Sequence, residues 1–223
     1  MHEILNTMHQ NKHARLLFKV DFEKAYDKVK WPFVYQMMRA KGFPESWCDW
    51  VMRCVIGGKV AVKVNDEIGG FFQTYKGLRQ GDSLSPLLFD IAADALPLLM
   101  HRAVDQGLVR GLGQEFLEEG VAILQYADDT IFLLEDNVEY AKKLKYILCL
   151  FEQMSGLKVN FHKSEVYRLG EAAEKKEIYS QILTCKMGDL PMRYLGVPID
   201  KKRIHNIDWK PVENKLEGKL SCW

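Results

Sequence analysis

The stretch QYADDTIFLLE, residues 125–135, places two adjacent aspartates between two apolar runs. The runs at 121–124 and 131–134 have the composition of buried strands, so the sequence predicts a hairpin with Asp128 and Asp129 at its tip. Two neighbouring carboxylates repel each other and should destabilise such a tip. Taken alone, however, the pair is also an ordinary polar turn, because aspartate is a good turn residue.

A second apolar run, RLLFKV at residues 15–20, also ends on an aspartate, Asp21. If this predicted strand lies beside the hairpin in one sheet, three carboxylates meet at the same end. Three close carboxylates need a counter-charge, and oxygen ligands favour a hard ion such as Mg²⁺ or Mn²⁺. A site of this kind suits phosphoryl transfer with two metal ions. Asp21 alone could equally be a helix N-cap.

The remaining pattern mixes helices with extended segments and contains no repeat or long linker. We predict a strand at 157–161, an extended segment at 193–199, a hairpin at 59–75, and helices at 31–42, 43–58, 83–107, 137–156 and 171–184. Asp136 or Asn137 should cap the helix that ends near Gly156, and Ser83 or Ser85 should cap the helix over 83–107. Pro97 should kink that helix. The predicted fold class is α+β.

Composition limits the class of protein. No apolar run is long enough to span a membrane, and residues 1–18 lack the apolar core of a signal peptide. The 5 cysteines form no C-x-x-C pair, which is typical of reduced thiols in a nuclear or cytosolic protein. The net charge of +1 combines a balance of −5 over residues 1–140 with +6 over residues 141–223. Such asymmetry suits a metal site and a phosphate-binding surface, although solvated helix faces give it too.

Five blocks in fixed order resemble the successive motifs of a reverse transcriptase. They are FKVDFEKAYD, GLRQGDSLSPLLF, YADD, GLKVNFHKS and YLGVPI, and they extend over nearly the whole chain from about residue 15. The residues of these blocks most resemble those of the polymerases of plant LINE-type (non-LTR) retrotransposons. A group II intron maturase or another reverse transcriptase lineage shares the YADD motif, but the last two blocks favour the LINE type.

The resemblance implies a polymerase right hand, in which these blocks form the palm. Asp21 and Asp128 then correspond to the two metal-binding aspartates, and Asp129 to their acidic neighbour. Two Mg²⁺ or Mn²⁺ ions would be bound there, with the Phe22 carbonyl available as a further ligand. The repulsion in the turn would then be offset by bound metal.

The resemblance also implies residues that contact the substrates. Tyr26 corresponds to the aromatic residue that excludes a ribose 2′-hydroxyl; most tyrosines are core aromatics, but its position five residues after Asp21 favours the excluding role. Arg79, Gln80 and Gly81 correspond to residues near the incoming nucleotide and template, and Arg79 could also be an ordinary surface charge. Lys163 corresponds to the lysine near the leaving pyrophosphate, where it would be a general acid or a charge stabiliser.

The C-terminal part resembles the primer-holding hairpin and the start of the thumb. Tyr194, Leu195 and Gly196 correspond to the hairpin that holds the primer end. We expect a palm with partial fingers over 1–200 and a truncated thumb over 201–223, where the KKR at 201–203 contacts phosphate or solvent. Few residues precede the first aspartate block, so we also expect a fragment of a longer enzyme, with poor polymerisation on its own.

The function expected from the resemblance is RNA-directed DNA polymerisation on a DNA primer 3′-OH. The partners would be an RNA template, a DNA primer and deoxynucleoside triphosphates, with no membrane and an intracellular location in the nucleus or cytoplasm. The alternative is a catalytically silent relic or a nucleic-acid-binding module with the palm fold.

Overall fold

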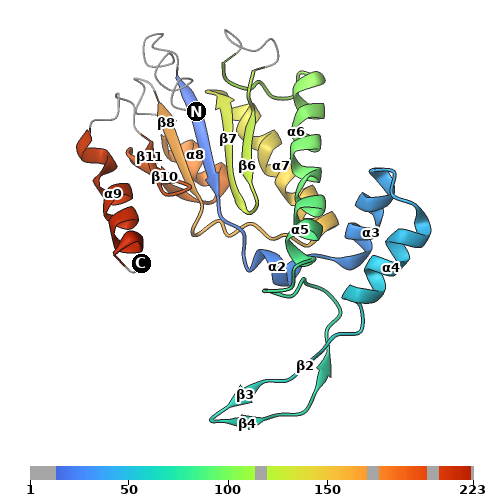
Figure 1. The fold of residues 1–223 in the computed structure, drawn as a ribbon. Helices are drawn as coiled ribbons and strands as arrows, with labels where there is room; N and C mark the ends of the chain where they lie inside the picture. The colour runs from blue at the N-terminus through green and yellow to red at the C-terminus, as the bar shows by residue number, and fades with distance from the viewer. Residues whose placement is uncertain (1–13, 114–119, 170–175, 200–205, 222–223) are drawn as a thin grey trace. The chain divides into compact units, whose positions relative to one another are not determined.

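The computed structural model describes residues 14–113, 120–169, 176–199 and 206–221 (Figure 1). The chain divides into two compact units. The sheet unit consists of Met1–Asp21, His101–Lys145 and Phe161–Trp223. The helical unit consists of Phe22–Met100 and Tyr146–Asn160. Each unit is described by itself below.

A five-stranded sheet forms the centre of the sheet unit, with the strand order β6-β7-β1-β8-β9. Its strands are β1 (Arg15–Val20), β6 (Ile123–Tyr126), β7 (Asp129–Glu135), β8 (Glu165–Leu169) and β9 (Lys186–Met187). β1 pairs antiparallel with both β7 and β8, so it lies in the middle of the sheet. The predicted strand at 15–20 and the predicted hairpin around Asp128 and Asp129 are therefore confirmed, and they are neighbours in one sheet.

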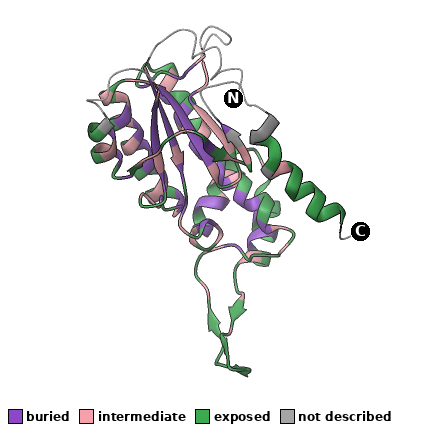
Figure 2. Ribbon diagram, turned by 90° about the vertical axis from the view of Figure 1, so that its left-hand side faces the viewer, coloured by how far each residue is buried: buried purple, intermediate pink, exposed green. Residues whose placement is uncertain are grey.

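The two faces of this sheet are both apolar, as expected for strands with nearly continuous apolar runs. On one face Leu17, Ile131, Leu133 and Tyr167 form a buried cluster with Leu112, Met192 and Ile199. On the other face the rings of Phe18 and Phe132 stack with centroids 6.3 Å apart. Figure 2 shows the burial of these strands.

Short elements flank the sheet within the same unit. They are α8 (Lys176–Leu183), β10 (Met192–Tyr194), β11 (Val197–Ile199) and α9 (Asn206–Leu220). β10 and β11 pair only with each other among the described residues and form a separate two-stranded hairpin. The extended segment predicted at 193–199 is thus a hairpin. The helix predicted at 171–184 is described only from Lys176.

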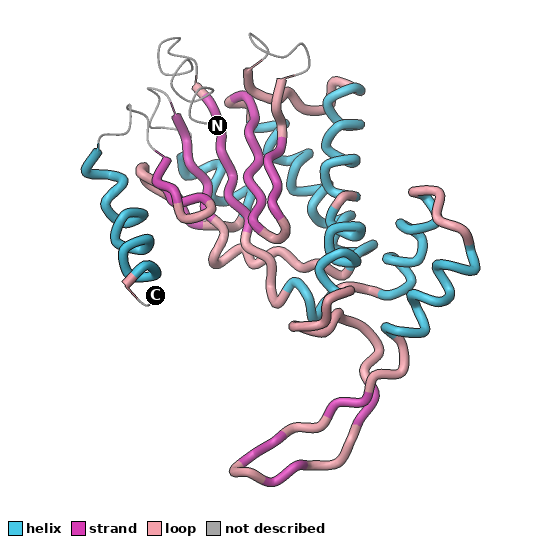
Figure 3. The backbone as a smooth tube through the Cα atoms, in the orientation of Figure 1, coloured by secondary structure: helices cyan, strands magenta, loops and turns pink. Residues whose placement is uncertain are grey.

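The helical unit is built mainly from helices, with one long ribbon. Its elements are α2 (Ala25–Lys28), α3 (Trp31–Ala40), α4 (Glu45–Val55), α5 (Ser85–Ala93), β2 (Lys59–Val60), β3 (Lys63–Val64), β4 (Glu67–Ile68) and β5 (Phe72–Gln73). Two further helices, α6 (Ala95–Asp105) and α7 (Val138–Ser155), contribute residues to both units. Figure 3 distinguishes the strands of the ribbon (magenta) from the helices (cyan).

The ribbon of the helical unit confirms the hairpin predicted at 59–75. Asn65 and Asp66 both have positive φ, at 48° and 68°, which is the backbone that a tight two-residue hairpin turn requires. All four strand segments of the ribbon are exposed (Figure 2). Ile68 and Phe71 keep 69% and 70% of their surface accessible, so the ribbon carries apolar side chains in solvent.

The long helix predicted over 83–107 is interrupted. α5 ends at Ala93 and α6 begins at Ala95, so the break falls at Asp94, three residues before Pro97. Pro97 has no N–H to donate to the carbonyl of Ala93, four residues earlier, and its ring crowds that carbonyl, which accounts for a break at this point.

Two local predictions were wrong, and for a third the structure confirms one of its two alternatives. Residues 157–161 form no strand, and only Val159 makes an isolated bridge, to Phe22. α5 is not capped by Ser83 or Ser85, because the Asp82 carboxylate accepts the Leu84 N–H at 3.0 Å and Ser85 is already helical and buried. α7 is capped by Asn137 and not by Asp136, since the Asn137 side-chain oxygen accepts the Glu139 N–H at 2.8 Å.

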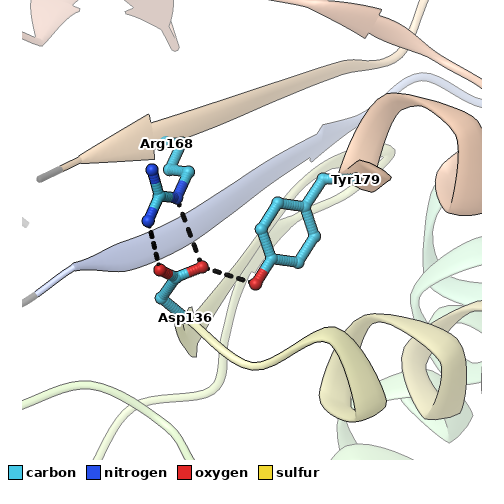
Figure 4. A network of polar contacts seen from close by, with 3 residues as sticks. All are labelled: Asp136, Arg168 and Tyr179. Atoms are coloured by element: carbon cyan, nitrogen blue, oxygen red, sulfur yellow. Dashed lines mark hydrogen bonds and ion pairs between the residues drawn. The ribbon is translucent and has the colours of Figure 1, made fainter. Parts of the chain in front are cut away.

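Asp136 instead belongs to a buried polar network in the sheet unit (Figure 4). It pairs with Arg168 of β8 and accepts a hydrogen bond from the Tyr179 hydroxyl of α8. The side chains of Arg168 and Asp136 are 2% and 7% exposed. The carboxylate raises the pKa of Arg168, and burial together with the same carboxylate raises the pKa of Tyr179. The network therefore joins β8, α8 and the start of α7.

Within the described ranges, none of the helices is both long and apolar enough to cross a membrane. The four described cysteines, Cys48, Cys54, Cys149 and Cys185, are free thiols, as predicted.

Candidate active site

One end of the central sheet brings the three predicted aspartates together. In the register of β1 and β7, Val20 lies opposite Thr130, so Asp21 continues one step further toward Asp129. Asp129 pairs with Tyr126 across the β6–β7 hairpin, and Asp128 is in the connecting turn. Asp21 and Asp128 are exposed, and Asp129 is half-buried. These residues therefore lie at the same end of neighbouring strands, which are about 4.8 Å apart. This end is called the aspartate-bearing edge below.

The turn that presents Asp128 has a left-handed backbone at a residue with a side chain. Ala127 has φ of 52°, and the turn consists of Ala127 and Asp128 between paired residues. Left-handed backbone costs roughly 1–2 kcal/mol for an L residue other than glycine. The strained residue Ala127 directly precedes Asp128 and Asp129. Local backbone strain of this kind is concentrated at functional sites.

The charges around Asp21 act on one another. Burial is the largest influence on the Asp21 carboxyl and raises its pKa above the ordinary value. Asp128 and Asp129 raise this pKa further by repulsion, while the ammonium groups of Lys163 and Lys19 lower it. The net direction is upward because burial is the largest influence; among the charged neighbours, Lys163 acts more strongly than Asp128, and Lys19 more strongly than Asp129.

Ser164 fixes the position of Asp21 and was missed in the sequence analysis. The Asp21 N–H donates to the Ser164 hydroxyl oxygen at 3.1 Å, and Ser164 is fully buried. It lies directly before β8, next to Lys163, so the end of β1 is joined to the start of β8. The serine is present in the quoted block GLKVNFHKS, but nothing in its spacing pointed to this contact.

Lys163 lies at the same sheet edge as the aspartates. β8 pairs with β1 so that Glu165 is opposite Lys19, and Lys163 is two residues before Glu165. Lys163 is exposed, and its charge lowers the pKa of Asp21. The predicted lysine therefore interacts electrostatically with the first predicted aspartate.

The predicted primer-holding residues lie at the tip of the β10–β11 hairpin. Leu195 and Gly196 form its turn with φ of 51° and 81°, and both are exposed. The Tyr194 hydroxyl donates to the Asp129 carbonyl oxygen at 3.5 Å. Burial and the nearby Asp129 carboxylate raise the pKa of Tyr194. The hairpin thus contacts the aspartate-bearing edge directly.

The residues predicted to contact the nucleotide belong to the helical unit. Phe22 is buried, and its ring meets that of Phe151 at 6.3 Å between centroids. Tyr26, in α2, stacks on Phe89 of α5 with centroids 4.7 Å apart and an interplanar angle of 11°. Tyr26 is nevertheless only half-buried. Its ring has a packing role, and part of it stays accessible.

The loop before α5 presents the other predicted nucleotide contacts. Arg79, Gln80 and Gly81 are all exposed. The Arg79 guanidinium lies against Gly58, where an added Cβ would come within 2.3 Å of it. Gly81 has φ of 89° with open space around it, which leaves its backbone free for close approach.

The acidic side chains of this end of the sheet are the candidate metal ligands. Within the described parts of the chain, no three His, Cys, Asp or Glu side chains are gathered closely enough to hold one. The donor type nevertheless fits a hard divalent cation, because Asp21, Asp128 and Asp129 supply carboxylate oxygens whose mutual repulsion a cation would offset. The prediction of a two-metal site stays a prediction.

Comparison with known proteins gives a consistent result. The family model described as "Reverse transcriptase (RNA-dependent DNA polymerase)" matches residues 1–199. The chain is 27% identical over 157 residues to a Pol polyprotein from the type-2 retrotransposable element R2DM of Drosophila melanogaster, covering 70% of this chain and 14% of that protein. It is also 27% identical over 173 residues to one from the element R2 of Nasonia vitripennis, covering 75% of this chain and 16% of the relative. The chain therefore spans about one sixth or less of these relatives.

Solved structures share the fold. A telomerase from Candida tropicalis, determined with a fragment of telomeric RNA, aligns with a TM-score of 0.62 over 89% of this chain and 30% of its own, at 15% identity. The apo telomerase of the same organism, truncated from its C-terminal domain, aligns with a TM-score of 0.58 at 17% identity, covering 89% of this chain and 36% of that one. The α+β class and the polymerase palm and fingers fold that we predicted are thereby confirmed.

Proposed function

This chain belongs to the reverse transcriptase (RNA-dependent DNA polymerase) family, and on that premise we propose that it is the RNA-directed DNA polymerase domain of a non-LTR retrotransposon. The similarity to polyproteins of R2 elements supports the non-LTR type. The activity would be extension of a DNA primer from its 3′-OH by deoxynucleoside triphosphates, copied from an RNA template. Because the chain spans a small part of its relatives, it would act as a portion of a longer enzyme.

The observation that carries this proposal is the placement of Asp21, Asp128 and Asp129 at one end of the sheet, within electrostatic influence of one another and of Lys163. These residues come from three separate sequence blocks, and the pKa of Asp21 responds to all of the other three. A carboxylate cluster with one adjoining cation is the residue set that phosphoryl transfer uses. Ser164, which accepts the Asp21 N–H, keeps the first carboxylate in place.

We propose that Asp21 and Asp128 hold two Mg²⁺ or Mn²⁺ ions, with Asp129 as their acidic neighbour and the Phe22 carbonyl as a further oxygen ligand. When bound, such ions activate the attacking hydroxyl and stabilise the charge on the leaving group. The protein's own contribution would be to present Asp21 from the end of β1 and Asp128 from the turn before β7. Lys163 would place its positive charge at the leaving pyrophosphate, as a charge stabiliser or a general acid.

The substrate contacts in this proposal follow the family motifs. Tyr26 would exclude the ribose 2′-hydroxyl with the accessible part of its ring. Arg79, Gln80 and Gly81 would approach the nucleotide and the template from the exposed loop before α5. Tyr194, Leu195 and Gly196 would hold the primer end, which the contact of Tyr194 with Asp129 supports.

The domain division and the origin remain part of the proposal. We propose a palm with partial fingers over 1–200 and the start of the thumb over 201–223, of which α9 is described and the KKR at 201–203 lies outside the described residues. A plant source is supported by 37% identity over 67 residues to an uncharacterised mitochondrial protein of Arabidopsis thaliana, covering 30% of this chain and 55% of that protein. The protein would act inside the cell, in the nucleus or cytoplasm.

The competing function is a catalytically silent relic, or a nucleic-acid-binding module, with the palm fold. The observation in its favour is that the chain spans 14% and 16% of the two R2 polyproteins, a small part of each. The two functions make opposite predictions for the effect of a divalent ion on the isolated chain.

Primer extension tests the proposal. The 223-residue chain is incubated with poly(rA)/oligo(dT), thymidine triphosphate and Mg²⁺ or Mn²⁺, beside the Asp128→Asn variant as control. Metal-dependent extension that Asp128→Asn abolishes supports the polymerase. Slow extension by the chain alone agrees with the loss of substrate-positioning contacts in a short chain. A chain that binds the duplex equally with and without metal, and extends no primer even when joined to the flanking segments of a related element, would identify the silent module.

A further inference from the structure

We propose that Lys19 is a positioning residue that holds the β10–β11 hairpin against the aspartate-bearing edge of the sheet. The proposal concerns the sheet unit alone. It rests on the proposed function only in one respect, the identity of the primer end as what the hairpin holds.

The hairpin needs such a residue because no described backbone ladder joins it to the main sheet. β10 and β11 pair with each other at three positions and form their own two-stranded sheet. An isolated two-stranded hairpin is marginally stable in water. Its place therefore depends on side-chain contacts, of which the apolar part is the packing of Met192 and Ile199 against the sheet.

Apolar packing is non-directional. It keeps the hairpin against the face of the sheet but does not fix its position along the strands. Hydrogen bonds are directional and fix the position along the strand. Among the described residues, two such contacts join the hairpin to β1 and β7. The Lys19 ammonium donates to the Arg193 carbonyl oxygen at 2.8 Å, and the Tyr194 hydroxyl donates to the Asp129 carbonyl oxygen at 3.5 Å.

Lys19 is well placed for this role by the pleat of β1. Side chains alternate along a strand, so Lys19 shares its face with Leu17 and Asp21. Glu165, its cross-strand neighbour in β8, accepts a hydrogen bond from Tyr167. The half-buried ammonium of Lys19 extends to the hairpin, to the residue directly before Tyr194. The Lys19 side chain thus joins the hairpin to β1 at a position two residues before Asp21.

Hydrogen exchange of the 223-residue chain, followed by mass spectrometry, tests this role without requiring polymerase activity. In Lys19→Met the amides of residues 192–199 should exchange about tenfold faster, because a charge-assisted hydrogen bond is lost. The amides of β1 should keep the wild-type rate. Lys19→Arg retains a positive donor and should restore most of the protection.

The matched control is Lys142→Met, which removes a lysine of α7 whose ammonium pairs with Glu139. It should leave the exchange of residues 192–199 unchanged. Tyr194→Phe removes the other polar contact and should also accelerate exchange of the hairpin, so this variant decides the matter if Lys19→Met does not fold. Unchanged hairpin exchange in both variants, or acceleration of β1 as large as that of the hairpin, would overturn the proposal.

A kinetic measurement then connects the hairpin to the primer. In a longer protein that extends primers, Lys19→Met should raise KM for the primer–template by about tenfold, with a smaller change in kcat, and Lys19→Arg should reverse the rise. If the longer wild-type protein extends no primer but Lys19→Met still loosens the hairpin, the proposed function fails and the positioning role of Lys19 stands. If KM is unchanged while the hairpin loosens, the hairpin does not hold the primer and that part of the proposal is wrong.

Discussion

The backbone N–H of Asp21 donates to the hydroxyl oxygen of Ser164 at 3.1 Å, and this bond joins the end of β1 to the residue that precedes β8. Ser164 has no exposed surface, so water cannot replace it as the acceptor. Asp21 lies beyond the last paired residue of β1, where the sheet ladder no longer fixes the backbone. The serine therefore sets the direction in which the first carboxylate leaves the sheet.

Ser164→Ala should lower the free energy of unfolding by about 1–3 kcal/mol, because it leaves the Asp21 N–H without an acceptor. The same change should weaken divalent-ion binding at the aspartates by letting Asp21 move. Urea denaturation measures the first effect, and titration with Mn²⁺ by calorimetry measures the second.

Ser180→Ala provides the matched control. The Ser180 hydroxyl donates to the Cys185 carbonyl at 2.6 Å, in α8 and away from the carboxylates. This variant should lose similar stability and bind Mn²⁺ like the wild type. Equal Mn²⁺ affinity in the two variants would remove Ser164 from the site and leave it a packing residue.

The buried pair of Asp136 and Arg168 should contribute strongly to stability when one partner is removed. Asp136→Ala leaves an uncompensated buried guanidinium, which typically costs about 3–5 kcal/mol. Glu139→Ala breaks an exposed ion pair with Lys142 on the same stretch of chain and should cost less than about 1 kcal/mol. Denaturant midpoints that fall equally in the two variants would contradict a structural role for the buried network.

Alkaline pH should destabilise the sheet unit through its buried tyrosines. Burial and carboxylate neighbours raise the pKa of Tyr167 and Tyr179 above the ordinary 10.0. Between the unfolded and folded pKa values the unfolded chain releases protons that the folded chain retains. The contribution of these tyrosines to the free energy of unfolding is therefore constant below pH 10 and falls as pH rises above it.

Tyr179→Phe isolates one part of this pH dependence. The variant should lose about 1–3 kcal/mol at pH 8, because the Asp136 carboxylate loses a donor. Above pH 10 its stability should fall less steeply than that of the wild type, as measured by urea denaturation at several pH values. An identical slope would show that Tyr179 does not contribute.

The sequence predicted the parts of this fold in which local pattern and tertiary structure agree. The apolar runs of β1 and β7 admit only a buried sheet, and an aspartate at the end of each run predicts a shared edge. Strand pairing could not be deduced from either run alone, and the link between them came from the family motifs. The strand predicted at 157–161 from its alternating pattern is absent. Val159 makes one isolated bridge to Phe22, and no ladder of strand pairs follows from it.

The contacts that the sequence did not reveal are those between side chains and distant backbone. Ser164 is 143 residues from Asp21, and Lys19 is 174 residues from Arg193. Such pairs have no periodic signature, since either residue alone is an ordinary serine or lysine. The sequence left Asp136 and Asn137 as alternative caps for a similar reason, because the partner of Asp136, Arg168, is identified only once β8 lies beside β1.

Tyr26 has both a packing contact and accessible surface, which separate variants can resolve. Tyr26→Ala removes the ring that stacks on Phe89 and should cost about 3 kcal/mol of stability, as for a large aromatic residue. In a longer, active protein it should also admit ribonucleotides more readily. Tyr26→Phe keeps the ring and should preserve discrimination between deoxynucleotides and ribonucleotides. Unchanged discrimination in Tyr26→Ala would leave packing as the role of this residue.

Lys163 provides the most direct test of the site, because its charge acts on Asp21 in the absence of any substrate. Lys163→Ala removes the influence that lowers the pKa of Asp21 most strongly, so that pKa should rise further. Asp21 would then need a higher pH to ionise, and the acid limb of the activity profile should shift to higher pH.

In single-turnover extension the rate should fall roughly 10²–10³-fold, with little change in nucleotide affinity, if the lysine stabilises charge in the transition state. Lys158→Ala, which removes an exposed lysine paired with Glu23 at 3.7 Å, is the control and should alter neither quantity. An NMR titration that finds the same Asp21 pKa with and without Lys163 would separate the lysine from the carboxylates and leave it a surface charge.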